Sequence, residues 1–486
     1  MGKRANGETG KRRNGRRQKK RTSFPLFSAL PFSPFAPCFY PLRQCLLLLF
    51  LSACIRSAEA QSVAPNQADA LLQRLLTAIR QIQIIDNHAH PALPSDPEMD
   101  ALFFDADGLA AMESFPLPVR LRPTNPEYVQ ALRVLYDYPY ADLSPEHLQE
   151  LAALKQQKRT TLGAAYFNEV LDKAGIAVSL ANRVGMNSAP LDRNRFKWVA
   201  FIDAYLFPLN NTVYKKMNAD YQLFFSSEEK LLKRYLDQVE TGGRPRRFDD
   251  YLRFVHESLT RLKADGAIAV KFEAAYLRPL HFADPSQRQA RRIYERYLHS
   301  TEVPEDEYRD LQDYLFRYLL REVTRLGLPV HVHTGFGIGN SFSFTGAHPL
   351  QLENIFSDPQ YRKTIFVLLH GSYPFTHEAM LLAGKPNVYI EPSEMTLMLY
   401  PSDLARVLKE WLIFYPEKIL FGTDAVVISD VVGAEETYWL ATETGRQALA
   451  LALSEMVQEG HCDEAEALHL ARLMLHDNAA KLYGLP

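Results

Sequence analysis

The sequence predicts an α/β protein folded as a (β/α)8 barrel (TIM barrel) with a helical insertion after the first strand. Three observations predict this fold: eight short apolar runs recur along the chain, segments mostly long enough for helices separate them, and several runs end in polar residues. Parallel strands covered on both faces have continuous apolar sequences, and eight strand-helix units close into a barrel. A doubly wound open sheet is less favoured, because no Gly-rich phosphate turn follows the first strand.

The first strand is expected at residues 84–91, after an amphipathic helix at residues 64–83. Two β-branched residues open this run, and Pro91 ends it. His88 and His90 are two positions apart, so in a strand both side chains lie on the same face. This pair is common in proteins without metal, and it indicates a metal site only if later strand ends supply further ligands.

A long insertion is expected at residues 92–170, where the sequence is rich in Pro and Asp at first and helical afterwards. It is too long for an ordinary loop, so we predict a helical cap. A second insertion carries a helix at 248–263, and a charged helical stretch covers 287–327. The later strands are expected at residues 176–180, 196–203, 267–273, 329–333, 365–370, 388–391 and 419–424.

Residues 1–60 are interpreted as a basic leader and signal peptide, which leaves residues 61–486 as the barrel. The apolar run at 45–53 is too short to span a bilayer comfortably, and Ala58-Glu59-Ala60 has the small-x-small form of a signal-peptidase site. The four residues ending at Cys54 also resemble a bacterial lipobox. Both interpretations predict export, to the periplasm or the exterior, and only the second adds a lipid anchor.

Charge and cysteine content exclude some classes of binding partner and some means of stabilising the fold. Residues 1–60 hold 12 basic and 2 acidic residues, so the remainder has 43 basic and 55 acidic residues and a net charge of −12. Such an acidic domain is a poor partner for nucleic acid or an anionic membrane. Cys462 alone lies outside the leader, so the barrel forms no internal disulfide and must rely on a large core, a metal or both.

Metal-binding residue types end four of the predicted strands. They are His88 and His90 on the first, His333 on the fifth, His370 on the sixth and Asp424 on the eighth. A barrel brings these ends together at its C-terminal mouth, where active sites of this fold lie. Several imidazoles with one carboxylate suit Zn²⁺, with Mn²⁺ and Fe²⁺ as alternatives. An isolated Asp424 would be interpreted as a helix N-cap, but the histidines favour a site.

The chain resembles the amidohydrolase superfamily, and within it the amidohydrolase-related branch that includes nodulin-type proteins. The resemblance covers most of the chain after the leader, with least support at the insertion. It rests on IIDNHAHP (84–91), VKFEAAYLR (270–278), PVHVHTGFG (329–337), FVLLHGSYPF (366–375), NVYIEPS (387–393), KILFGTDA (418–425) and DNAAKLYGL (477–485).

This resemblance implies a metal-dependent barrel that hydrolyses a small amide, ester or lactone. A bound divalent ion lowers the pKa of its water to about 7. Asp424 is expected to accept that proton and return it to the leaving group, while the ion or an imidazole, with His370 as the candidate, polarises the carbonyl. A non-hydrolytic lyase such as a decarboxylase is the alternative, and a catalytically idle binder is a third hypothesis that Asp424 disfavours.

Residues on the fifth and the fourth predicted strands each allow two interpretations. His331 and His333 share a face, but His333 is nearer the strand end and matches the family's ligand, so His331 is interpreted as a deeper, hydrogen-bonded residue. Lys271 lies on the fourth strand, where two-metal members of the superfamily carry a carboxylated lysine that bridges both ions. It equally suits a charge pair with Glu273, so one or two ions are expected.

Three further residues are candidates for binding substrate. Arg278 and Arg183 follow predicted strands and offer guanidinium groups for a carboxylate, although a salt bridge is an equal explanation for Arg278. Glu391 ends the seventh strand and is expected to orient a ligand or the substrate, with a local structural role as the alternative. The expected partner is a small-molecule substrate, and the sequence leaves open whether the protein forms a homo-oligomer.

Overall fold

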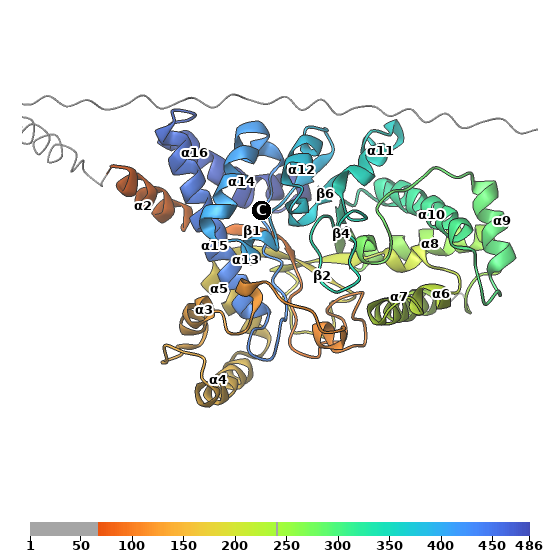
Figure 1. Cartoon of the computed structure of the whole chain (residues 1–486), viewed down its shortest axis with the longest axis horizontal. Coiled ribbons are helices and arrows are strands. Elements are labelled where there is room, and N and C mark those ends of the chain that lie inside the picture. Colours follow the sequence, from red (N-terminus) through yellow and green to blue (C-terminus); the bar gives the residue numbers. More distant parts are fainter. Residues whose placement is uncertain (1–66, 240–241) are drawn as a thin grey trace, which may run out of the picture. The chain divides into compact units, whose positions relative to one another are not determined.

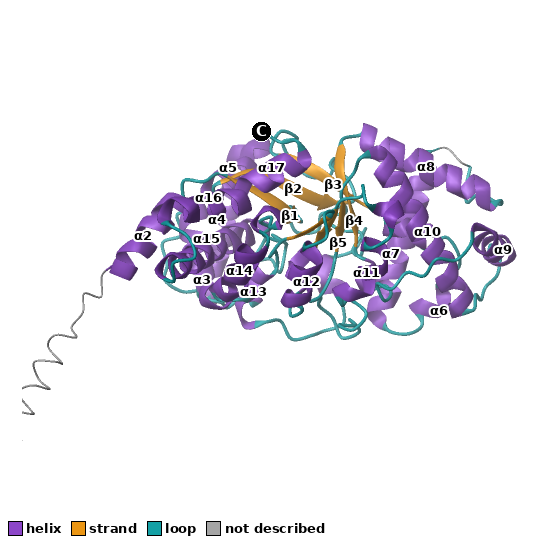
Figure 2. Ribbon diagram, turned by 90° about the horizontal axis from the view of Figure 1, so that it is seen from above, coloured by secondary structure: helices purple, strands orange, loops and turns teal. Residues whose placement is uncertain are grey.

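A parallel sheet with its strands in sequence order is the centre of the computed structural model, which describes residues 67–239 and 242–486. Figure 2 shows the strands gathered in the middle, with helices around them. The predicted leader, including the Ala58–Ala60 site and Cys54, lies outside the described residues. The seven strands are β1 (Ile84–Ala89), β2 (Ile176–Arg183), β3 (Phe196–Phe201), β4 (Ala267–Phe272), β5 (Val330–Val332), β6 (Phe366–Leu368) and β7 (Val388–Ile390).

The predicted parallel α/β fold is confirmed, but the eighth apolar run forms isolated bridges and no regular strand. Ile419 bridges Ile390 of β7, while Phe421 and Ala425 bridge β1. The physical reason lies in side-chain hydrogen bonds. The Thr423 N–H is donated to the Asp86 side chain at 2.8 Å instead of to a backbone carbonyl of β1. Asp424 then takes a left-handed backbone with φ of 56°, which ends the extended conformation.

Sixteen α-helices of the described residues connect and surround these strands (Figure 1). Before β4 the helices are α2 (Gln67–Ile79), α3 (Glu127–Tyr136), α4 (Pro145–Leu162), α5 (Tyr166–Ala174), α6 (Thr212–Lys215), α7 (Ala219–Gln238) and α8 (Phe248–Ala264). After β4 they are α9 (Gln287–Tyr297), α10 (Glu305–Leu326), α11 (Glu353–Phe356), α12 (Thr376–Ala383), α13 (Met395–Met398), α14 (Pro401–Phe414), α15 (Ala434–Gln458), α16 (Glu464–Arg472) and α17 (Asn478–Tyr483). Among the helices of the described residues, none combines the length and apolar character of a membrane span.

The first insertion is helical, as predicted, and buried ion pairs fasten it to α15. Lys155 on α4 lies 2.8 Å from Glu436, and Arg159 lies 2.8 Å from Glu435. Both glutamates are fully buried, so their charges need these partners. The insertion is thus held against the helix that follows the Asp424 segment.

Apolar residues from the sheet meet α17 in a cluster of their own. Ile85, Val199 and Val367 belong to it, together with Ala479 of α17. Tyr483, at the end of α17, lies 2.7 Å from Nε2 of His331 and donates a hydrogen bond to Asn87 Oδ1 at 2.5 Å. The interpretation of His331 as a deeper, hydrogen-bonded histidine therefore matches its position.

Candidate active site

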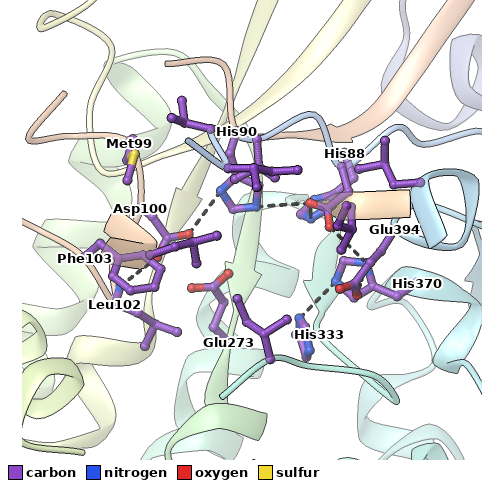
Figure 3. A pocket seen from close by; sticks show the side chains of 18 of the residues that line it. His88, His90, Met99, Asp100, Leu102, Phe103, Glu273, His333, His370 and Glu394 are labelled. Carbon is purple, nitrogen blue, oxygen red and sulfur yellow. Dashed lines mark hydrogen bonds and ion pairs between the residues drawn. The ribbon is translucent and has the colours of Figure 1, made fainter. Parts of the chain in front are cut away.

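The five predicted ligands at the strand ends line one cavity. It measures about 890 Å³, its opening to solvent included. Figure 3 shows His88, His90, His333 and His370 around this space. The five lining ligands are His88, His90, His333, His370 and Asp424. Because they come from distant parts of the chain, the ordered parallel strands are what unite them.

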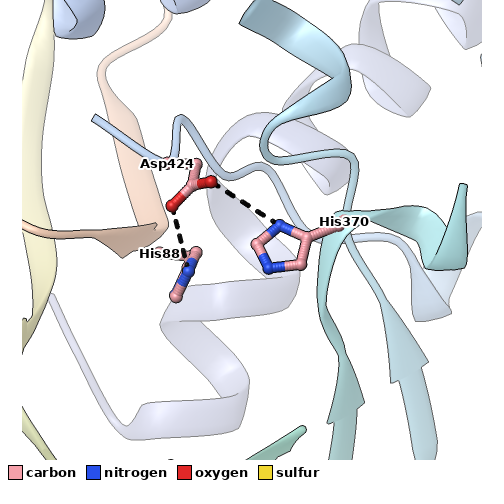
Figure 4. Close-up of side chains that lie close together, drawn as sticks. All are labelled: His88, His370 and Asp424. Carbon is pink, nitrogen blue, oxygen red and sulfur yellow. Dashed lines mark ion pairs between the residues drawn. The ribbon is translucent and has the colours of Figure 1, made fainter. Parts of the chain in front are cut away.

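Three of these residues form a group with the spacing of metal ligands. One donor atom from each of His88, His370 and Asp424 lies within 4.8 Å of the others. The Asp424 carboxylate lies between the two rings (Figure 4), with Oδ1 3.2 Å from His88 Nε2 and Oδ2 3.8 Å from His370 Nδ1. His90 Nε2 also lies 3.6 Å from Asp424 Oδ1.

Strained backbone conformations place several of these side chains. His370 has φ of 62°, Ser372 53°, Glu394 59° and Asp424 56°, all in a region that residues other than Gly rarely adopt. Such conformations cost of order 1–3 kcal/mol each and gather at functional sites. All four follow β6, β7 or the eighth run, where the chain turns away from the sheet.

The imidazole rings of His333 and His370 lie within hydrogen-bonding distance of each other. His333 Nε2 donates to the carbonyl of Phe336 at 2.8 Å, because a carbonyl oxygen can only accept. A neutral His333 therefore carries a lone pair on Nδ1, and this atom lies 2.9 Å from His370 Nε2. The choice of His333 over His331 agrees with this geometry, since His333 lines the cavity and His331 does not.

Burial sets the protonation of the site. It lowers the pKa of His88, His333 and His370 well below the ordinary value of 6.5, so these imidazoles are neutral and keep a lone pair. Burial also raises the pKa of Asp424, with the charge of His90 acting in the opposite direction. Neutral imidazoles beside a carboxylate are what a divalent cation requires of its ligands.

Lys271 lies beside this group but does not line the cavity. Its Nζ is 3.3 Å from Glu273 Oε1 and 3.4 Å from His88 Nε2, and the side chain is fully buried. The charge pair with Glu273 is thus present in the structure. A bridging role for Lys271 remains a prediction.

The predicted substrate-binding residues lie elsewhere. Arg278 donates to Asp313 at 2.6 Å and to Gln312 at 2.9 Å, and Arg183 donates to Asp96 at 2.8 Å. Glu391 is buried and accepts hydrogen bonds from the backbone N–H of His370 at 3.1 Å and of Ser393 at 2.5 Å. The structure brings none of these three to the cavity wall, because each is already occupied by structural partners.

Two carboxylates at the cavity were missed from the sequence. Asp100 belongs to the insertion, and with His90 and Glu273 it forms a second group of closely spaced donor atoms. The Asp-rich start of the insertion is the only signal that points to it. Glu394 follows β7 and lines the cavity, but neither periodicity nor a motif marks it.

Part of the chain matches a known protein family. Residues 256–485 match the family model described as amidohydrolase. This match covers a little under half of the chain. A 190-residue stretch is 33% identical to Protein fluG of Emericella nidulans, which amounts to 38% of this chain and 21% of that protein. The chain thus spans about a fifth of this relative.

Solved structures of similar fold include isomerases and a protein assigned as a metal-dependent hydrolase. A Lactobacillus casei protein assigned as a metal-dependent hydrolase has 18% identity and a TM-score of 0.54, covering 84% of this chain and 97% of that one. Uronate isomerase from Thermotoga maritima has 13% identity and a TM-score of 0.51, covering 85% and 97%. Glucuronate isomerase from Caulobacter crescentus has 13% identity and a TM-score of 0.52, covering 87% and 95%.

The donor set fits the divalent metal that the superfamily uses. His88 Nδ1 is buried without a hydrogen-bond partner, and donor atoms of two neutral imidazoles and a carboxylate lie within 4.8 Å of one another, as ligands of one ion do. Residues 256–485 thus match the amidohydrolase family model, and the fold is similar to that of a protein assigned as a metal-dependent hydrolase and of two isomerases.

Proposed function

We propose that this enzyme hydrolyses a small amide, ester or lactone, with a divalent ion held by His88, His370 and Asp424 and flanked by His90 and His333. The observation that carries the proposal is the convergence of the first three at a buried cavity. Zn²⁺ is the first candidate for the ion, with Mn²⁺ and Fe²⁺ as alternatives, because imidazole and carboxylate ligands suit all three. When bound, the ion supplies Lewis acidity and makes a water ligand more acidic.

Asp424 is the proposed proton carrier. Burial favours the protonated form of its carboxyl group, so it can accept a proton from a nucleophilic water and deliver it to the leaving group. Its two oxygens face different rings, and Asp424 lines the cavity. His370 is the proposed second catalytic group, because its ring also lines the cavity and is oriented by Ser393 and His333.

We also infer that the eight apolar runs form a closed (β/α)8 barrel and that the chain belongs to the nodulin-type branch. The bridges of the eighth run to both β7 and β1 support the closed barrel.

Export, the division at residue 60 and a lipid on Cys54 are proposals supported by the leader sequence alone. Lys271 as a bridging ligand is supported by its distance of 3.4 Å from His88.

Product analysis tests hydrolysis against the lyase alternative. The metal-loaded protein is incubated in ¹⁸O-labelled water with a panel of small amides, esters, lactones and carboxylic acids, and products are identified by mass spectrometry. Hydrolysis incorporates one labelled oxygen into the acid product. Release of CO₂ without incorporation of label would reject the hydrolase in favour of a decarboxylase.

A further inference from the structure

The cavity walls are mostly apolar beyond the strand-end histidines. Side chains from the insertion and from α13 after β7 form them: Leu102, Phe103, Leu109, Leu117, Leu121 and Leu397. Such a lining accommodates a hydrocarbon or aromatic group and removes it from water on binding. The part of the ligand that contacts these walls is therefore apolar.

The polar side of the cavity is acidic. Asp100, Glu273, Glu394 and Asp424 line it, and no Arg or Lys of the described residues does so. The nearby cations are already engaged: Lys271 with Glu273, Arg183 with Asp96 and Arg278 with Asp313. A ligand carboxylate would therefore find no cationic side chain on these walls.

Glu394 is the carboxylate without an internal role. It is 8% exposed, and its Oε2 is buried with no hydrogen-bond partner. Figure 3 shows this side chain at the cavity beside His370, whose Nδ1 lies 3.7 Å from Oε2. Glu394 is also the N-cap residue of α13, yet its side chain makes no capping hydrogen bond. A buried carboxyl group without hydrogen bonds is costly, so its position and its strained φ of 59° call for a partner from outside the chain.

We propose that Glu394 binds a cationic N–H group, a protonated amine or guanidinium, on a ligand whose apolar body rests on the leucine-rich walls. This proposal rests on the proposed function in one respect: it takes the cavity to be the active site. A ligand N–H would satisfy Oε2, and a guanidinium matches a carboxylate with two parallel hydrogen bonds. Glu394 is not part of the close three-residue group of His88, His370 and Asp424, so it is free for this role.

The test is equilibrium binding of a matched pair of probes to the metal-loaded protein, measured by titration calorimetry. The probes are N-(2-phenylethyl)guanidinium and N-(2-phenylethyl)urea, which share shape and apolar group but differ in charge. Wild-type protein is expected to bind the guanidinium about tenfold or more tightly than the urea, because hydrogen bonds to charged groups are the stronger ones. In Glu394→Gln the guanidinium Kd is expected to rise about tenfold or more, and the urea Kd to change less than about threefold.

Glu353→Gln is the control, because it removes the same charge from an exposed glutamate on α11. It should leave both Kd values unchanged. Equal binding of the two probes by the wild-type protein would overturn the proposal whether or not the variant folds. A retained guanidinium preference in folded Glu394→Gln would also overturn it, as would a loss of bound metal, which would make Glu394 a ligand of the ion.

The proposed hydrolase activity and this binding specificity can be rejected independently of each other. Binding needs no turnover, and the metal content of the same samples is measured independently. A preference for guanidinium in protein that hydrolyses nothing would reject the hydrolase and retain the cationic subsite. Hydrolysis without that preference would retain the hydrolase and reject the subsite.

Discussion

Asp424 meets His88 through both backbone and side chain. Its N–H donates to the His88 carbonyl at 2.7 Å, and its Oδ1 lies 3.2 Å from His88 Nε2. The first bond fixes the end of the eighth run against the end of β1, and this contact brings the carboxylate to the imidazole. The positions of the donors at this site therefore depend on the packing of the first and last units of the sheet.

Replacing Asp424 by Asn should strongly reduce turnover while preserving the fold. The amide has nearly the same shape but cannot carry the proton, so kcat is expected to fall by about 10²–10⁴-fold. The measurement is the rate on the best substrate of the panel, with metal content determined on the same sample. A metal-loaded Asn variant with full turnover would show that Asp424 carries no proton in the reaction.

Replacing Lys155 by Met should destabilise the protein strongly. It removes the partner of Glu436, which is fully buried, and breaking a buried pair in this way costs about 3–5 kcal/mol. Chemical denaturation, compared with wild-type protein, measures the change in free energy of unfolding.

Lys158→Met is the matched control on the same helix. Lys158 is partly exposed and pairs with Glu169 at 3.1 Å, so its loss should cost less than about 1 kcal/mol. Equal effects of the two substitutions would contradict the buried attachment of the insertion to α15.

The environment of Glu228 predicts that the stability of the folded protein depends on pH. Burial, together with the charges of Asp203, Glu273 and Asp100, raises the pKa of Glu228 well above its ordinary value of 4.5, and neither of its oxygens accepts a hydrogen bond. The folded state therefore holds a proton that the unfolded state releases. This contribution to stability is fully present below the unfolded pKa and is lost as the pH rises towards the folded pKa.

Glu228→Gln should thus gain stability relative to wild-type protein as the pH rises from 5 to 8, by up to about 1.4 kcal/mol per pH unit. Thermal unfolding at several pH values measures the difference. Glu229→Gln is the control, since Glu229 already pairs with Lys215 at 2.6 Å, and it should show no such growth. If the difference in stability between Glu228→Gln and wild-type protein did not change with pH, a protonated Glu228 in the folded protein would be ruled out.

The sequence was sufficient for the parts of the site that follow strand periodicity. His88, His90, His333 and His370 stand at the ends of apolar runs, and parallel pairing in sequence order brings them to one cavity. Arg278 could not be placed in this way. Its role depends on Asp313 of α10, a partner that no local pattern indicates.

The acidic side of the cavity was equally hidden in the sequence. Asp100 reaches His90 because the insertion folds over the strand ends, with its Oδ2 3.1 Å from His90 Nδ1. Glu394 reaches the cavity through a left-handed turn after β7. Both placements arise from tertiary packing and loop conformation, which have no periodic signature.

The most direct test of the metal centre is the metal content of the purified protein and of two variants, measured by inductively coupled plasma mass spectrometry. Wild-type protein should hold at least one divalent ion per chain, and His88→Ala should lose it. His377→Ala, which changes an exposed histidine paired with Glu410, should retain it. Wild-type protein without stoichiometric metal, or His88→Ala with undiminished metal, would contradict the assignment of the site.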